Sequence, residues 1–421
     1  NFTLSDKQVD SVKKSPSFCY LEVKTKHEKI ALKMFRIKSK EEQRNEFGEL
    51  VNMDMERHDF ELDDLVERIK ENDHRLIALQ VPEGLKMQAL EMMDSIEEDS
   101  EAKVVLAADP CYGACDLVHD KMRMMGVELV AHMGHSAMNI DSGMPTHFIP
   151  VTYNGDPEID PVVPILARHK AIAESRLAEA STPFDLSEDE ARERFVDAVG
   201  RVAPLSGTKL GLVGSIQHLH LLPEYKERFE NAGFEVEIPV GGARLTFPGQ
   251  VLGCNYSGDD PSIGHYIFLG SGDFHPIGLV MHTGKPLALL DPYNGEASEM
   301  SFERIERILR QRMGLIFSVD DAMSFGILIG EKPGQMRRNL AIRMKRLLEQ
   351  HGKKGYLLAL DHVGPDLIDF YPVDAFVNTA CPRIAIDDAV KYAKPLITPL
   401  FQVRELTPVA FNTTEFPKHV T

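Results

Sequence analysis

Hydrophobic residues along most of the chain follow two alternating patterns. Short apolar runs bounded by Gly, Pro or Asp, such as RLIALQV (75–81) and KVVLAAD (103–109), are typical of buried strands in a parallel sheet. Outside these runs, apolar residues recur at helical spacing, as at Leu62, Leu65 and Ile69. The succession of buried strands and amphipathic helices predicts an α/β fold with mainly parallel sheets flanked by helices.

The succession starts three times, which predicts three similar domains. Each copy opens with a strand and a turn, continues with a helix and further strands, and reaches a cysteine. The three opening turns are VPEG (81–84), GSIQ (214–217) and GEKPG (330–334). In the second copy we expect further strands at EVEIPVGG (235–242) and QVLGC (250–254), and two or three more within 265–292.

Four segments are expected along the chain. Residues 1–57 form an N-terminal appendage, interpreted as a small strand pair and a helix. The three α/β domains are predicted at 58–165, 166–315 and 316–421. Between Gly155 and Leu205 we expect a helical connection, in which Ser187 and Glu190 have the spacing of a capping box.

Three of the five cysteines lie just beyond short apolar runs, one in each copy. These are Cys115, Cys254 and Cys381. Because loops at the carboxyl ends of parallel strands are the usual ligand sites of such sheets, we expect the three thiols to meet if the domains pack around a pseudo-threefold axis. Three thiolates can hold an iron-sulfur cluster with one iron left open. The alternative is three buried small residues near strand ends, a common place for cysteine.

Two further cysteines have less defined roles. Cys111 competes with Cys115 for the ligand position in DPCYGACD (109–116). Cys115 is favoured because the turn before it is expected to bring it to the start of a helix, where the helix dipole lowers a thiol pKa. Cys19 lies in the appendage and is interpreted as structural. A zinc site is not favoured, since paired ligands at C-x2-C spacing are missing.

Composition narrows the class of protein. The 421 residues are 43% hydrophobic and carry a formal net charge of −18, which argues against a nucleic-acid partner, since phosphate neutralisation needs clustered Lys and Arg. No apolar stretch reaches the roughly 18 residues that a membrane span needs, so no membrane partner and a cytoplasmic location are expected. An odd cysteine count does not fit a disulfide scaffold.

The three cysteine motifs resemble those of a known enzyme family. DPCYGACD (109–116), GQVLGC (249–254) and ACPRIAIDD (380–388) are similar to the motifs of the enzymes that begin diphthamide biosynthesis, in their archaeal homodimeric form. The resemblance extends from about Phe60 to Phe401. It implies three similar α/β domains around a 4Fe-4S cluster that is held by Cys115, Cys254 and Cys381.

The resemblance also implies a reaction. S-adenosylmethionine would dock against the open iron, and an electron from the reduced cluster would cleave its sulfur bond to the methionine γ-carbon. The 3-amino-3-carboxypropyl fragment would add to an imidazole carbon of a histidine in translation elongation factor 2, and methylthioadenosine would leave. A homodimer, an electron donor and a cytoplasmic location are further implications. An imidazole carbon is a poor nucleophile at neutral pH, which explains the need for radical chemistry.

Two other functions fit a cluster with three cysteine ligands. A quinolinate-synthase-like dehydratase would use the open iron as a Lewis acid without S-adenosylmethionine, but the motifs around Cys115 and Cys381 argue against it. A non-catalytic partner subunit would carry the cluster only for electron transfer or assembly. Retention of all three cysteines weakens that interpretation.

Other polar residues at expected strand ends or turns are candidates for the S-adenosylmethionine pocket. They are Glu83, Gln217, Asp273, His275 and Asp291. Their alternative role is turn formation with satisfied hydrogen bonds.

Three histidines lie in or near predicted strands of the first copy, and for them a metal-ligand role is not favoured, because they have no counterparts in the other copies. They are His132, His135 and His147.

Overall fold

The computed structural model describes residues 8–15, 18–24, 29–36, 57–140, 143–180, 207–300 and 302–399. These residues belong to two compact units. The N-terminal strands and the short segment Glu83–Gln88 belong to the first unit, and the remaining described residues belong to the second. The boundaries of the four predicted segments stay predictions.

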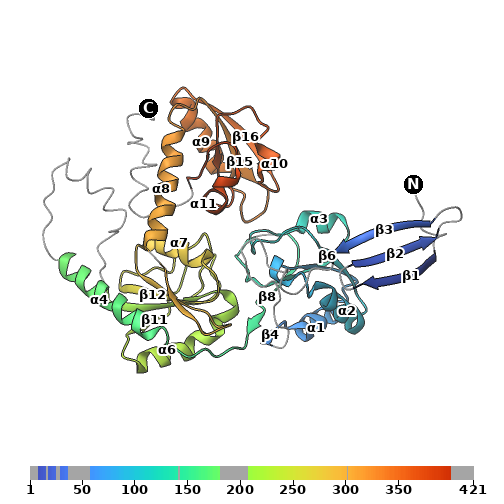
Figure 1. The fold of residues 1–421 in the computed structure, drawn as a ribbon, viewed down its shortest axis with the longest axis horizontal. Coiled ribbons are helices and arrows are strands. Elements are labelled where there is room, and N and C mark those ends of the chain that lie inside the picture. Colours follow the sequence, from blue (N-terminus) through green and yellow to red (C-terminus); the bar gives the residue numbers. More distant parts are fainter. Residues whose placement is uncertain are drawn as a thin grey trace. The chain divides into compact units, whose positions relative to one another are not determined.

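The first unit contains an antiparallel sheet of three consecutive strands. Its strands are β1 (Gln8–Ser15), β2 (Phe18–Lys24) and β3 (Lys29–Arg36), in the order β1-β2-β3 (Figure 1). The sheet therefore has one strand more than the predicted strand pair. The predicted helix falls in residues 37–56, outside the described residues. Cys19 lies in β2, away from the other four cysteines along the chain.

Four parallel strands form the first sheet of the second unit, in the order β6-β5-β7-β8. They are β5 (Leu76–Gln80), β6 (Lys103–Ala107), β7 (Leu129–Met133) and β8 (Thr146–Ile149). The associated helices are α1 (Leu62–Glu71), α2 (Ala89–Ser100) and α3 (His119–Met124). The 3-10 turn η4 (Glu83–Leu85) belongs to the first unit. The short strands β4 (His58–Asp59) and β9 (Thr152–Tyr153) pair separately.

The second sheet has the order β11-β10-β12-β13-β14, in which β14 alone is antiparallel to its neighbour. Its strands are β10 (Lys209–Gly214), β11 (Val236–Glu237), β12 (Ile263–Leu269), β13 (Leu287–Leu290) and β14 (Ala297–Glu299). The helices are α4 (Val163–Ala180), η5 (Ile216–Leu221), α6 (Leu222–Asn231) and α7 (Phe274–Thr283). Successive residues of β12, such as Ile267 and Phe268, enter two different core clusters, so both faces of this sheet are buried.

The third sheet has four parallel strands in the order β16-β15-β17-β18. They are β15 (Ser324–Gly330), β16 (Lys354–Leu360), β17 (Ala375–Asn378) and β18 (Leu396–Ile397). The helices are α8 (Phe302–Ser318), α9 (Arg338–Gln350), α10 (Pro365–Ile368), α11 (Ile384–Asp387) and the 3-10 turn η6 (Ala389–Lys391). The predicted α/β class with mainly parallel sheets flanked by helices is confirmed.

The parallel strands of all three sheets share one order. In each sheet the first strand in the chain is flanked by the second and the third, and the fourth lies beyond the third. The cysteines, however, are not in equivalent places. Cys115 and Cys254 lie between the second and third strands, whereas Cys381 follows the third strand, β17. The prediction that the cysteines occupy corresponding places is wrong for Cys381.

Two predicted strands of the second copy differ from the structure. The strands expected within 265–292 are β12 and β13, and residues 274–283 between them form helix α7, which was not predicted because its apolar residues are buried almost all round and the run shows no clear period. In QVLGC (250–254), Gln250 makes only an isolated bridge to Gly214. The segment EVEIPVGG forms a strand of two residues only, β11.

The predicted helical connection begins as expected but is only partly described. Helix α4 covers Val163–Ala180. The candidate capping box at Ser187 and Glu190 lies outside the described residues. Within the described ranges, none of the helices combines the length and the apolar character needed to cross a membrane.

Candidate functional site

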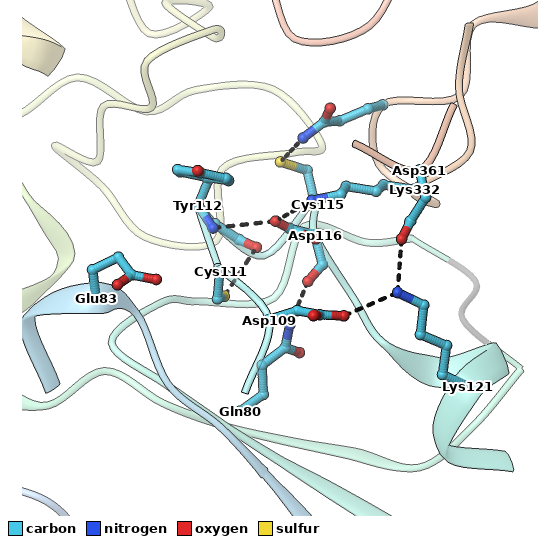
Figure 2. Close-up of polar contacts among 12 residues, drawn as sticks. Gln80, Glu83, Asp109, Cys111, Tyr112, Cys115, Asp116, Lys121, Lys332 and Asp361 are labelled. Carbon is cyan, nitrogen blue, oxygen red and sulfur yellow. Dashed lines mark hydrogen bonds and ion pairs between the residues drawn. The ribbon is translucent and has the colours of Figure 1, made fainter. Parts of the chain in front are cut away.

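The loop that carries Cys115 connects β6 to α3 and is held by buried polar contacts. The Gln80 side chain donates from Nε2 to the Asp116 carbonyl oxygen at 2.6 Å. Lys332, from the loop after β15, places Nζ 2.7 Å from Asp116 Oδ2, and both side chains are largely buried. At the surface, Lys121 lies between Asp109 and Asp361 (Figure 2). The loop is thus attached both to its own sheet and to segments around the third sheet.

The loop after β15 lies directly against Cys115. The Gly334 backbone N–H donates to the Cys115 carbonyl oxygen at 3.1 Å. Gln335 donates from Nε2 to Cys115 Sγ at 3.5 Å. A Cβ atom at Gly334 would lie 2.4 Å from the Cα of Cys115, so the close approach requires glycine here.

The loop of Cys254 is covered by an aromatic ring that also contacts the loop of Cys381. A Cβ atom at Gly253 would lie 2.3 Å from Phe274 Cε1, so the ring lies against the backbone just before Cys254. The Arg383 guanidinium lies over the same ring, 4.3 Å from its centroid. Phe274 therefore links the second and third cysteine loops.

The loop of Cys381 is ordered by hydrogen bonds from its own strand and from the residue before α9. The fully buried Asn378 donates to the Cys381 carbonyl oxygen at 2.6 Å and accepts from the Ala380 N–H at 3.0 Å. Arg337, which precedes α9, donates from Nη1 to the Ala380 carbonyl oxygen at 2.6 Å. This second contact brings a cationic side chain to the cysteine.

The three thiols lie close enough to influence one another electrostatically. Burial raises the pKa of the Cys381 thiol to about 12, and the charges of Cys115 and Cys254 contribute to that rise. Burial likewise raises the pKa of Cys115, where the Gln335 hydrogen bond opposes the shift and the charge of Cys254 adds to it. The structure thus brings together the three cysteines that the sequence singles out.

Three arginines surround this group of thiols. Burial raises the pKa of Cys254, while Arg337, Arg244 and Arg383 lower it. The charges of all three thiols act in turn on Arg337, whose pKa is lowered mainly by burial. The site is therefore a partly buried sulfur group in a cationic environment.

The expectation that a helix start lowers the pKa of Cys115 is wrong. Helix α3 begins only at His119, and Cys115 lies in the irregular turn before it. The pKa of its thiol is raised, because burial penalises the thiolate more than nearby donors stabilise it.

Two of the candidate pocket residues lie in helix α7 or at its start. Asp273 precedes α7 and forms an ion pair with Arg304. His275 stacks on the Phe268 ring, and burial lowers its pKa to about 4, with smaller effects of Arg383 and His135. His275 therefore lies near the cysteine loops, although it is in a helix and not at a strand end.

The other three candidates make local or bridging contacts. Gln217 donates from Nε2 to the Gly134 carbonyl oxygen at 2.8 Å, which joins η5 to the end of β7. Asp291 accepts the Tyr293 N–H at 2.8 Å, a contact typical of a turn. Glu83 forms an ion pair with Lys86 at 2.6 Å within the first unit.

Two of the three histidines of the first copy meet at a cysteine. One sulfur of Cys111 and one ring nitrogen each of His132 and His135 lie within 4.8 Å of one another. His147 is not part of that group. Sequence reasoning missed this convergence, because β7 and the Cys115 loop meet only in the folded domain.

Several residues beside the three thiols were also missed by sequence reasoning. They are Arg244, Lys332, Gln335, Arg337 and Arg383. Two signals pointed to three of them. The opening turn GEKPGQ (330–335) contains Lys332 and Gln335, and the motif ACPR (380–383) contains Arg383.

Comparisons with known proteins identify relatives over most of the chain. A family model described as putative diphthamide synthesis protein matches residues 81–176 and 184–403. The 2-(3-amino-3-carboxypropyl)histidine synthase of Pyrococcus horikoshii is 33% identical over 342 residues, which are 81% of this chain and 89% of that protein. The enzyme of the same name from Methanocaldococcus jannaschii is 24% identical over 347 residues, 79% of this chain and 85% of that protein.

A solved structure is also similar. The crystal structure of Dph2 from Pyrococcus horikoshii with a 4Fe-4S cluster superposes with a TM-score of 0.65 at 31% identity. The similarity covers 82% of this chain and 89% of that chain.

Proposed function

The chain belongs to the family of putative diphthamide synthesis proteins, and we propose that it acts as a 2-(3-amino-3-carboxypropyl)histidine synthase, the first enzyme of diphthamide formation. The resemblance inferred from the three cysteine motifs is confirmed. The named relatives carry the name of the predicted transferase and not that of a dehydratase. The observation that carries the proposal is the meeting of Cys115, Cys254 and Cys381, one from each of three similar sheets.

We propose that these three thiols hold a 4Fe-4S cluster, the kind of cluster present in the crystal structure of the related Dph2. The described residues fit such a group. The thiols influence one another electrostatically, yet they do not form a group whose ligand atoms all lie within 4.8 Å, as around a single ion. Sulfurs bound to separate corners of a cluster lie farther apart than sulfurs that share one metal ion. Three cysteines also leave one iron without a protein ligand.

When bound, the cluster supplies an open iron and an electron for cleaving S-adenosylmethionine. The chain's own residues bind and orient the reactants. The cationic side chains Arg244, Arg337 and Arg383 offset the negative charge of the thiolates and attract the substrate carboxylate. Arg383 is buried, with Nη1 without a hydrogen-bond partner among the described residues, which suits it to a carboxylate oxygen.

The remaining features of the proposal follow from the family. The acceptor is a histidine of translation elongation factor 2, the chain works as a homodimer in the cytoplasm, and an electron donor reduces the cluster. The three similar sheets are arranged pseudo-threefold around the cluster. Among the predicted pocket residues, His275 is placed best for S-adenosylmethionine, since it responds to the charge of Arg383. Glu83, Gln217, Asp273 and Asp291 stay candidates for the same pocket.

The test is an anaerobic assay with dithionite, S-adenosylmethionine labelled in its 3-amino-3-carboxypropyl part, and elongation factor 2. We expect label on the acceptor protein and release of methylthioadenosine. Cys254→Ala serves as the matched inactive control. The proposal fails if iron-loaded protein releases no methylthioadenosine, or if label transfer persists without Cys254.

A further inference from the structure

A second group of metal-binding side chains lies on the other side of the Cys115 loop. Cys111, in the same loop, is 3% exposed, and His132, in β7, is fully buried. His135 is the second residue after the end of β7. Each offers one ligand atom, and all three atoms lie within 4.8 Å of one another. The transfer reaction proposed above does not use this group.

The distances within the group are close to those of a tetrahedral metal site. Cys111 Sγ lies 4.0 Å from His132 Nε2, and that nitrogen lies 3.0 Å from His135 Nδ1. With metal-ligand bonds of zinc length, tetrahedral angles place sulfur and nitrogen about 3.6 Å apart and two nitrogens about 3.3 Å apart. These two distances therefore differ from those of a metal site by only a few tenths of an ångström, and the third pair, Cys111 and His135, lies within 4.8 Å.

The His132 ring is held in the orientation that a metal ligand needs. Its Nδ1 lies 2.9 Å from Gln80 Oε1. The amide orientation of Gln80 is fixed, because its Nε2 donates to the Asp116 carbonyl, which only accepts. Nδ1 of His132 therefore carries the proton, and Nε2 directs its lone pair at Cys111 and His135. An outer hydrogen bond of this kind orients most metal-binding histidines.

A hydrogen-bond network alone accounts poorly for the cysteine. If His135 donates from Nδ1 to His132 Nε2, the lone pair of that nitrogen is occupied. Within the part of the chain that the structure describes, the Cys111 sulfur then has only long polar contacts, at 4.0 Å to the Gly113 carbonyl and 4.0 Å to His132 Nε2. A cation between the three atoms satisfies all of them at once.

We propose that Cys111, His132 and His135 bind one divalent ion of the zinc class, separate from the iron-sulfur cluster. One thiolate and two imidazoles are a ligand set that suits Zn²⁺. The ion would tie the loop that carries Cys115 to β7 and so fix the position of that cysteine. The proposal goes beyond the transfer reaction and does not depend on it.

The test measures zinc and iron in anaerobically purified full-length protein and in two serine variants. Wild-type protein is expected to hold about one zinc and about four irons per chain. Cys111→Ser should lose the zinc and keep the iron, whereas Cys115→Ser should lose the iron and keep the zinc. Zinc retained in Cys111→Ser overturns the proposal. Iron absent from every sample, with zinc still dependent on Cys111, refutes the cluster and leaves the zinc site standing.

A second measurement needs no variant of the ligands. Cobalt exchanged into the wild-type protein should show a thiolate-to-cobalt charge-transfer band, and its absence overturns the proposal. Gln80→Ala should weaken zinc binding by about 10–100-fold, because it removes the outer hydrogen bond of His132. His147→Ala is the matched control and should bind zinc like wild type. Equal affinities of Gln80→Ala and wild type would contradict the assigned role of His132.

Discussion

Cys111 and Cys115 belong to one short loop, yet their surroundings differ. Cys111 faces the sheet of its own domain and meets histidines at the end of β7. Cys115 faces away from it and is contacted by Gly334 and Gln335 of the loop after β15. The comparison shows that neighbouring sulfurs in a sequence can have different surroundings, since nearby side chains of a loop point toward different partners.

Loss of one of the three proposed cluster cysteines should have the largest effect. Cys254→Ala is expected to abolish both iron binding and methylthioadenosine release, because a cluster with three protein ligands loses one of them. Cys19→Ala, in the N-terminal sheet, should leave iron content and turnover nearly intact. Iron analysis and the anaerobic assay measure both. Equal losses in the two variants would remove the distinction between the cysteines.

The ion pair between the Cys115 loop and the third sheet gives the next largest expected effect. Lys332→Met leaves the buried carboxylate of Asp116 without its cation, which costs about 3–5 kcal/mol of unfolding free energy. Lys121→Met is the matched control: its two ion pairs are about half exposed, so a loss below about 1 kcal/mol is expected. Denaturant unfolding followed by circular dichroism compares the two. Equal losses would show that Lys332 does not anchor this loop.

Replacement of the glycine that touches Cys115 tests the close approach itself. Gly334→Ala should cost about 1–3 kcal/mol, since the new methyl group meets backbone atoms that cannot move aside. Gly314→Ala, within α8 and with open space around it, should instead add about 0.5–1 kcal/mol through helix propensity. The shift in unfolding midpoint measures both. An unchanged unfolding midpoint in Gly334→Ala would mean that the loop after β15 does not need to lie so close to Cys115.

The last comparison concerns buried histidines with and without hydrogen-bond partners, whose effect on stability appears only in acid. His132 has the Gln80 contact, whereas both ring nitrogens of the buried His265 lack hydrogen-bond partners among the described residues, and burial lowers the pKa of His265 to about 3. The His265 ring is therefore protonated below about pH 6.5 in the unfolded chain but stays neutral in the folded chain at that pH. Stability from this group is complete above that pH and falls, by up to about 1.4 kcal/mol per pH unit, as the pH drops toward 3.

The measurement is the unfolding free energy of wild type and His265→Leu between pH 7 and pH 4. The variant should show a shallower decline with falling pH, because it has no ring to protonate in the unfolded state. Parallel declines in the two proteins would assign the acid sensitivity to other groups.

Much of the fold followed from local patterns. Buried strands such as β5, β6 and β12 were predicted, because short apolar runs bounded by Gly, Pro or Asp are typical of buried strands. Helix α7 was not predicted, since a segment buried on nearly all sides shows neither the helical nor the strand period. The strand expected before Cys254 is absent, because the chain turns at Gly249 and Gly253 and is covered by Phe274.

The candidate site, like the fold, was predicted only in part. The sequence singled out the three cysteines that we propose as cluster ligands, since thiols after three repeated strands are recognisable without coordinates. Only the tertiary structure decided that Gln335 and Arg383 adjoin them and that Cys111 meets His132 and His135. These contacts join residues from separate strands and loops, and their positions depend on how long-range packing places one sheet edge against another, which no local pattern encodes.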